Sequence, residues 1–241
     1  MSTTPAKFKV YKNVFDEFTE RTLFELGSKG MFDRESLVPF SMGKEANIFW
    51  GTGKTGDVIV KIYRLQSCDF NRMYDYIKFD PRFIQLKKQR RKVILAWVHR
   101  EYRNLLKARE AGVNAPTPYT IKNNIIVMKC IGKDNPAPKL KDLSPKNPQE
   151  FLEETIRNVE RLYKGGFVHA DLSKFNILND NEQPVLIDFS QSTTLSNQNA
   201  HDYLKRDLKN ICDYFTKLGV SCDPEAIFQK IIRSDPGKTK I

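Results

Sequence analysis

Two stretches of the sequence, His169-Ala170-Asp171-Leu172-Ser173-Lys174-Phe175-Asn176 and Val185-Leu186-Ile187-Asp188-Phe189, decide how the rest is interpreted. An Asp and an Asn lie five residues apart on one predicted loop, and a second Asp directly follows an apolar strand. Mg²⁺ prefers oxygen ligands and usually keeps waters beside substrate phosphates, so Asn176 and Asp188 suit a metal. Asp171 suits a general base for an attacking hydroxyl. The pattern predicts a phosphoryl-transfer site.

Each of these residues also has a plainer interpretation. Asp171 could cap a helix, Asn176 could form a turn and Asp188 could end a strand. Their joint spacing, in this order, favours the site over three separate structural roles. His169 is expected to support the loop through backbone hydrogen bonds rather than to perform chemistry.

A single lysine interrupts the apolar run Val58-Ile59-Val60-Lys61-Ile62. A buried ammonium needs a carboxylate or a phosphate as its partner. Glu101 falls at or beside the inward apolar stripe of a predicted helix, so we predict a Lys61–Glu101 ion pair that orients the lysine onto the α and β phosphates of ATP. The alternative places both residues on the surface.

The remaining pattern predicts a strand-rich first half and a helical second half. We expect helices from a cap at Asn13 to Gly27 or Gly30, and over 93–112, 148–164 and 202–218. Strands are expected over 37–40, 46–50, 58–63, 119–121 and 125–130, with two shorter ones near 177 and 185–187. The charged stretch 67–92 lacks clean periodicity and is interpreted as an insertion or mobile loop, and the proline-rich stretch 132–148 as a linker. These elements predict one compact α+β unit.

Composition narrows the class of protein. The chain has 241 residues, 40% hydrophobic and 29% charged, as in ordinary globular proteins. No apolar run is long enough to cross a bilayer and the N-terminus lacks a signal peptide pattern, so we expect a cytoplasmic protein. Four scattered cysteines without a CxxC pair predict reduced thiols, with no zinc site or disulfide framework. The net charge of +11 favours phosphate-bearing partners such as RNA, although a basic surface that serves only solubility is the alternative.

Three segments carry a resemblance to a known family: SMGKEANIFWG at 41–51, HADLSKFNIL at 169–178 and LIDFSQ at 186–191. They resemble the RIO family of atypical serine/threonine protein kinases, and most closely the archaeal-like form of its first subfamily. Met42 replaces the threonine of the family's phosphate loop, and Ser190 replaces the glycine of the D-F-G motif of ordinary kinases. The GxGxxG loop of ordinary kinases is absent.

The resemblance implies a minimal bilobal protein kinase-like fold. Residues 1–35 would form an N-terminal helical extension, 36–131 the N-lobe with a flexible loop at 67–92, and 132–241 the hinge and a reduced helical C-lobe. That C-lobe would lack the activation segment and the peptide-substrate platform, because little chain follows Asp188 and no APE motif is present.

The resemblance also assigns the nucleotide site. Met128 would guard the back of the adenine pocket, and backbone groups of Lys129 and Ile131 would bind the base edge. The residues predicted to act in the chemistry are Lys61, Asp171 and Asp188, and Asn176 and Asp188 are predicted to hold Mg²⁺, with Mn²⁺ as an alternative. The residues predicted to bind ATP are Ser41, Gly43, Lys44, Glu45, Lys61, Glu101, Met128, Lys129, Ile131, Ser173, Asn176 and Asp188.

The function expected from the resemblance is that of a Mg-ATP-dependent serine/threonine kinase, with ATPase activity, in small ribosomal subunit maturation. Its partners would be the pre-small subunit, rRNA and assembly proteins, without membrane or DNA. The basic run 87–92 could contact rRNA or could be a solvated face. One alternative is an ATPase switch on pre-ribosomal particles, with water or Asp188 receiving the phosphoryl group. Another is an inactive RNA-binding pseudokinase.

Overall fold

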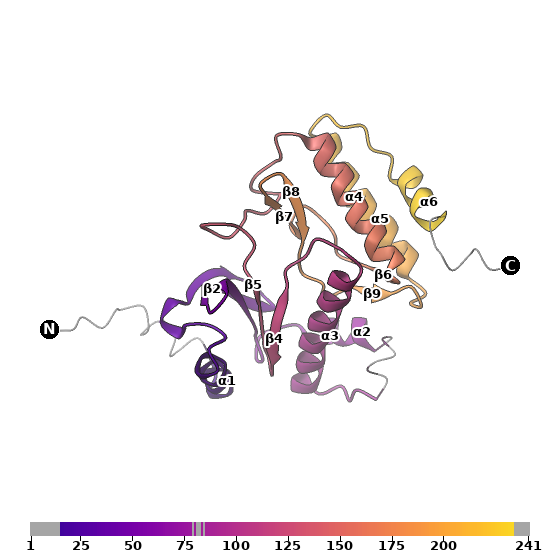
Figure 1. Ribbon diagram of the computed structural model, residues 1–241. Helices are drawn as coiled ribbons and strands as arrows, with labels where there is room; N and C mark the ends of the chain where they lie inside the picture. The colour runs from indigo at the N-terminus through magenta and orange to yellow at the C-terminus, as the bar shows by residue number, and fades with distance from the viewer. Residues whose placement is uncertain (1–14, 79, 81–82, 84, 234–241) are drawn as a thin grey trace.

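A five-stranded antiparallel sheet forms the first half of the computed structural model, which describes residues 15–78, 80, 83 and 85–233. The strand order is β1-β2-β3-β5-β4 (Figure 1). The strands are β1 (Val38–Met42), β2 (Ala46–Gly53), β3 (Gly56–Tyr63), β4 (Pro118–Lys122) and β5 (Ile125–Lys129). All were predicted within a few residues, because alternating apolar residues and turn formers mark them clearly.

Strand β3 divides its side chains between the two faces of the sheet. Val58, Val60 and Ile62 join a core with helix α1 (Glu17–Ser28), whereas Tyr63 joins the core that contains helix α3 (Arg90–Glu110). Because side chains alternate along a strand, Lys61 points to the α3 face with Tyr63. The alternation is what brings the lysine to Glu101.

The second half is mainly helical. Figure 1 shows α4 (Pro148–Lys164), α5 (Ala200–Thr216) and α6 (Pro224–Arg233) grouped away from the sheet. Between α4 and α5, β6 (Phe167–Val168) pairs with β9 (Thr193–Thr194), and β7 (Ile177–Asp180) pairs with β8 (Gln183–Leu186). The predicted α+β arrangement, with an antiparallel sheet followed by a helical half, is confirmed.

The described part of the stretch 67–92 is more ordered than predicted. Helix α2 (Phe70–Ile77) lies within it, and α3 begins at Arg90. Met73 and Ile77 are buried and join the core that contains α3. One apolar pair four residues apart is too short a pattern to reveal a helix among so many charges.

Several shorter elements were not predicted at all. They are the 3₁₀ turn η2 (Arg34–Ser36), strands β6 and β9, and helix α6. The predicted cap Asn13 lies outside the described residues. Helix α1 instead begins after Asp16, whose carboxylate accepts the N–H of Thr19 at 2.8 Å.

The prediction that all cysteines are reduced is wrong. Cys212 on α5 and Cys222 before α6 form a disulfide with a Cα–Cα distance of 5.2 Å. The chain turns back between the two helices, which brings together cysteines ten residues apart, a spacing that is no recognised motif. Cys68 and Cys130 are free and buried, as expected. In the described ranges, no helix is long and apolar enough to span a membrane.

Candidate active site

A cavity of about 420 Å³ collects the predicted site residues, and its volume is within the usual range for small-molecule sites. Ser173 does not line it; the Ser173 carbonyl instead accepts the N–H of Asn176 at 2.9 Å within the loop. The predicted residues that line the cavity are Ser41, Gly43, Lys44, Glu45, Lys61, Glu101, Met128, Lys129, Ile131, Asp171, Asn176 and Asp188. Five stretches far apart in the sequence therefore contribute to one site: 41–45, 61, 101, 128–131 and 171–188.

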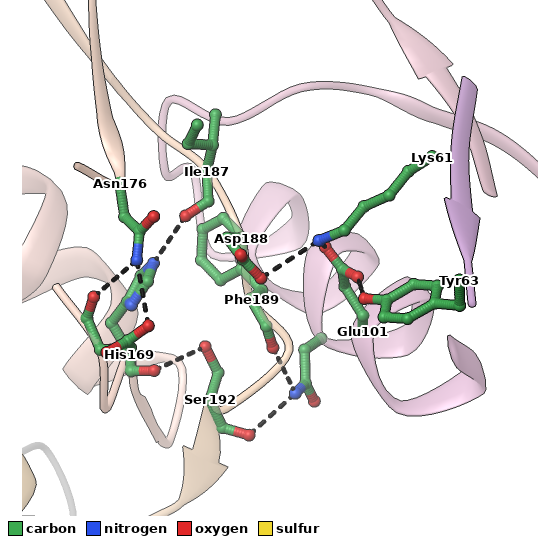
Figure 2. A network of polar contacts seen from close by, with 11 residues as sticks. Lys61, Tyr63, Glu101, His169, Asn176, Ile187, Asp188, Phe189 and Ser192 are labelled. Atoms are coloured by element: carbon green, nitrogen blue, oxygen red, sulfur yellow. Dashed lines mark hydrogen bonds and ion pairs between the residues drawn. The ribbon is translucent and has the colours of Figure 1, made fainter. Parts of the chain in front are cut away.

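Lys61 is the centre of a buried charged network (Figure 2). Its Nζ lies 2.7 Å from Oε1 of Glu101 and 3.2 Å from Oδ1 of Asp188. The predicted ion pair is present, and the alternative of surface placement is wrong because Lys61 and Glu101 are both buried. The hydroxyl of Tyr63 donates to the other carboxylate oxygen of Glu101. Tyr63 was not predicted, although its position two residues after Lys61 puts it on the same face.

Lys61 and Asp188 keep their charges at neutral pH, whereas burial raises the pKa of Glu101 to about 7. Burial lowers the pKa of Lys61, but the charges of Asp188 and Glu101 outweigh burial and hold that pKa above its ordinary value. Burial raises the pKa of Asp188, whereas the Lys61 charge and a hydrogen bond from Ser190 lower it to about 2. The site therefore presents an ammonium beside an ionised carboxylate.

Asn176 and Asp171 meet on the loop between β6 and β7. The Nδ2 of Asn176 donates to the carbonyl of Asp171 at 2.8 Å and to its Oδ2 at 3.1 Å. Because the amide nitrogen is occupied, the amide oxygen is the atom of Asn176 left for a cation. The described residues contain no cluster of three or more His, Cys, Asp or Glu suited to a metal. Two oxygen donors, Asn176 and Asp188, fit Mg²⁺ held partly by phosphates and water.

Helix α5 fixes the backbone of this loop. Asp207 accepts the N–H of Ala170 at 2.8 Å and that of Leu172 at 2.9 Å, and Arg206 donates to the Ala170 carbonyl. Ala170 has a φ of 65° and Asp188 a φ of 63°, conformations that cost a non-glycine residue about 1–3 kcal/mol. Only the folded chain reveals the two hydrogen bonds that Asp207 accepts.

His169 and Asn104 secure the segment that follows Asp188. Nε2 of His169 lies 3.1 Å from the carbonyl of Ile187, in agreement with the structural role predicted for this residue. Burial lowers the pKa of His169 to about 4, so the ring is neutral. From α3, Nδ2 of Asn104 donates to the carbonyls of Phe189 at 3.0 Å and Ser192 at 2.8 Å. Figure 2 shows these contacts on one side of Asp188 and Lys61 on the other.

The predicted adenine end already has two of its backbone groups occupied. The N–H of Lys129 donates to the carbonyl of Thr117 at 2.8 Å, and the carbonyl of Ile131 accepts the N–H of Ala137 at 2.7 Å. A bound base would therefore meet the Lys129 carbonyl and the Ile131 N–H. Met128 is buried in the cavity wall, as its predicted position requires.

The predicted phosphate loop is a tight turn between β1 and β2. The N–H of Gly43 donates to the carbonyl of Ala46 at 3.0 Å. A Cβ at position 43 would lie 2.8 Å from that same oxygen, so only glycine fits without displacing the backbone. Lys44 and Glu45 follow it on the cavity wall.

Comparison with known proteins places these features in a family context. The family model described as RIO domain matches residues 47–227. A RIO-type serine/threonine-protein kinase Rio1 from Haloferax volcanii is 36% identical over 96% of this chain and 80% of that protein. Its namesake from Methanocaldococcus jannaschii is 39% identical over 92% of this chain and 77% of that protein.

A solved structure has a similar fold. It is the Rio2 kinase from Chaetomium thermophilum, described as an ADP/Mg²⁺-phosphoaspartate complex. The TM-score is 0.67 at 22% identity, covering 90% of this chain and 66% of that one. This likeness confirms the predicted kinase-like fold, and the residues at the site must be argued on their own.

Proposed function

The chain belongs to the RIO domain family and is an atypical serine/threonine protein kinase, and from this premise we propose that its cavity binds ATP with Mg²⁺. The γ-phosphoryl group passes to a serine or threonine hydroxyl. The observation that carries the proposal is that one cavity brings together Lys61, paired with Glu101 and Asp188, and Asp171, hydrogen-bonded to Asn176.

In the proposed mechanism, side chains of the protein position the reactants and move one proton. Glu101 holds the Lys61 ammonium in place, where it binds phosphate oxygens as a fixed positive charge. The amide oxygen of Asn176 and a carboxylate oxygen of Asp188 would hold Mg²⁺, which would neutralise phosphate charge when bound. Asp171 accepts the proton of the acceptor hydroxyl. Burial raises the pKa of Asp171, which makes it a stronger base than an exposed aspartate.

The decisive experiment replaces the proposed base. Asp171→Asn keeps the shape of the side chain but cannot accept a proton, so kcat for transfer from γ-labelled ATP to protein should fall by about 10²–10⁴-fold. ATP should still stabilise the variant against thermal unfolding. Asp213→Asn, at an exposed position on α5, is the control and should keep full activity. Undiminished transfer by Asp171→Asn would contradict the assignment of Asp171 as the base and would mean that another group accepts the proton.

A second candidate function is ATP hydrolysis at the same site. The observation that favours it is that the Asp188 carboxylate lines the cavity, is ionised and keeps 38% of its side chain exposed. One of its oxygens would attack the γ-phosphorus as the bond to ADP breaks, and water would then cleave the acyl phosphate to release phosphate. Label on the protein that hydroxylamine removes would support this route, and label stable to hydroxylamine would exclude it.

We further propose that the protein acts in the cytoplasm on small ribosomal subunits during their maturation. The basic run 87–92 at the start of α3 is exposed, as an rRNA contact requires. Cosedimentation with small ribosomal subunits, weakened by rising salt, is the expected result. Comparing the wild type with Asp171→Asn in cells separates this proposal from the scaffold alternative, because a scaffold would tolerate the loss of the base.

A further inference from the structure

Two arginines from separate helices act on Asp171, and a lysine follows it in the same loop. Arg72 on α2 is exposed and lines the same cavity as Asp171. Arg206 on α5, also exposed, donates to the carbonyl of Ala170, the residue before Asp171. Lys174 lies three residues after Asp171 in the same loop. The entrance beside the proposed base is therefore positively charged.

The two arginines act electrostatically on Asp171 itself. Burial and the charge of Asp188 raise the pKa of Asp171, while Arg206 and Arg72 act in the opposite direction. Interaction between charges falls off with distance, so both guanidinium groups lie close enough to Asp171 to act on its charge.

In the described part of the chain these cations make no direct ion pair, although Arg72 and Arg206 act at longer range on Asp171, and Arg72 also on Glu45. Within the ranges that the structure describes, none of Arg72, Arg206 and Lys174 forms an ion pair with a carboxylate. By contrast, Lys205 and Lys209, on the same helix as Arg206, pair with carboxylates at 3.3 and 2.6 Å. The unpaired charges are thus available to an external acidic group.

An exposed aromatic side chain adjoins the same loop. Phe175 has 51% of its surface exposed, and the ammonium groups of Lys174 and Lys141 lie 5.5 and 5.9 Å from the centre of its ring. Lys174 also lies 5.8 Å from the ring of Tyr214. An apolar surface bordered by lysines suits a peptide that carries both apolar and acidic side chains.

We infer that the acceptor is a serine or threonine within an acidic stretch of polypeptide, an inference that rests on the proposed kinase function. Carboxylates flanking the hydroxyl would bind Arg72, Arg206 or Lys174 while the hydroxyl reaches Asp171. The oxygen of the serine or threonine hydroxyl forms the new bond to the γ-phosphorus while the bond from that phosphorus to the bridging oxygen of ADP breaks. The proton of the hydroxyl passes to Asp171. A polypeptide is favoured over RNA because the relatives are serine/threonine-protein kinases.

The test uses three peptides of equal length with one serine, flanked by Asp and Glu, by Asn and Gln, or by Lys and Arg. The full-length protein with γ-labelled ATP and Mg²⁺ should show kcat/KM about tenfold higher for the acidic peptide than for the neutral one, and less so at high salt. Arg72→Glu and Lys174→Glu should each bring that ratio towards one. Lys54→Glu makes the same change of charge in the β2–β3 turn, away from the cavity lining, and should leave the ratio unchanged.

Each other outcome has a defined meaning. Equal kcat/KM for the three peptides, or a ratio that survives both reversals, would overturn the inference and leave the kinase proposal intact. Inhibition by poly(U) that Lys174→Glu relieves, without any acidic preference, would assign the surface to RNA and also overturn it. Phosphate release without any labelled peptide would overturn the inference in favour of hydrolysis. If the protein shows no labelled peptide, releases no phosphate and is not stabilised by ATP, the proposed function is refuted as well.

Discussion

Tyr63 shows how one residue on the same face of a strand as Lys61 can support a buried ion pair. Its hydroxyl donates to Glu101, whose other oxygen binds Lys61, so both oxygens of the buried carboxylate are satisfied. A buried carboxylate that loses one of its donors costs more than the hydrogen bond alone. Tyr63 is therefore predicted to hold Glu101 in the orientation that Lys61 requires.

Tyr63→Phe should lower the free energy of unfolding by about 1–3 kcal/mol, because it removes a hydrogen bond to a buried charged group and keeps the ring. It should also raise KM for ATP, since Glu101 then positions Lys61 less firmly. Urea denaturation and steady-state kinetics measure the two effects. Tyr119→Phe, at an exposed position on β4, is the matched control, and equal losses in both variants would refute the role of Tyr63.

His169 makes a second residue-scale prediction, which concerns pH. Its pKa is lowered from the ordinary 6.5 to about 4 because the ring is buried. Above pH 6.5 the ring is neutral in both folded and unfolded chains. As the pH falls from 6.5 to 4, only the unfolded chain takes up the proton, so the folded state should lose up to about 3 kcal/mol.

His169→Gln should remove this acid-dependent loss. The difference in unfolding free energy between variant and wild type should be constant above pH 6.5 and should shift in favour of the variant below it. Chemical denaturation at a series of pH values gives this difference directly. His201→Gln is the comparison variant, because it removes an imidazole at an exposed position. A flat difference for His169→Gln would mean that the ring is protonated inside the folded protein.

At the residue scale, the sequence predicts the groups that share a motif and misses those that do not. Asp171, Asn176 and Asp188 were found because their spacing is short and ordered, and Lys61 because a lysine in an apolar strand is unusual. The contacts of Asn104 join positions 85 and 88 residues apart in the chain. No local pattern encodes such partners, so they required the fold.

At the scale of elements, α4 and α2 mark the limits of prediction. Helix α4 was predicted with correct bounds because Asn147 caps it, Pro148 begins it and Gly165 follows its last residue. Helix α2 has only eight residues and two buried side chains, so its charged surroundings obscured it. An element is predictable when its own residues mark both its ends.

The disulfide that joins α5 to the segment before α6 predicts sensitivity to reductants. It closes a loop with a sequence separation of 10, so its removal should lower the free energy of unfolding by about 2.5 kcal/mol through the entropy of the unfolded chain. Urea denaturation with and without dithiothreitol measures this change.

A matched variant separates the effect of reductant on the disulfide from any effect on the free cysteines. The double variant Cys212→Ser with Cys222→Ser should be less stable than the wild type and indifferent to dithiothreitol. Cys68 and Cys130 are free and should contribute nothing to the reductant effect. If reductant leaves the wild type unchanged, the two cysteines are not bonded in solution.

At the scale of the whole molecule, the cavity joins the sheet to the helical half. Residues of β3, β5 and the β1–β2 turn form its walls together with Asp171, Asn176 and Asp188 from the other half. The family resemblance predicted this arrangement, because it rests on motifs from both halves. The proposed domain boundary after residue 131 stays a prediction, as does the use of Mn²⁺.

A ligand that contacts both halves should stabilise the whole chain. At a free ATP concentration about 100 times Kd, with Mg²⁺, the free energy of unfolding should rise by about 2.7 kcal/mol. Thermal or urea denaturation across an ATP titration checks this. Asp188→Asn should lose the part of the shift that depends on Mg²⁺, whereas Asp213→Asn should keep it. A shift unaffected by Mg²⁺ in the wild type would remove the metal from the proposal.

The left-handed backbone at Asp188 has an evolutionary consequence. Glycine and asparagine also adopt a φ of 63°, so the backbone conformation alone would accept either of them at this position. The acid is required there by the buried Lys61 ammonium, with which it forms an ion pair, and by the proposed chemistry. Its identity in any descendant would therefore record whether that ion pair is still under selection.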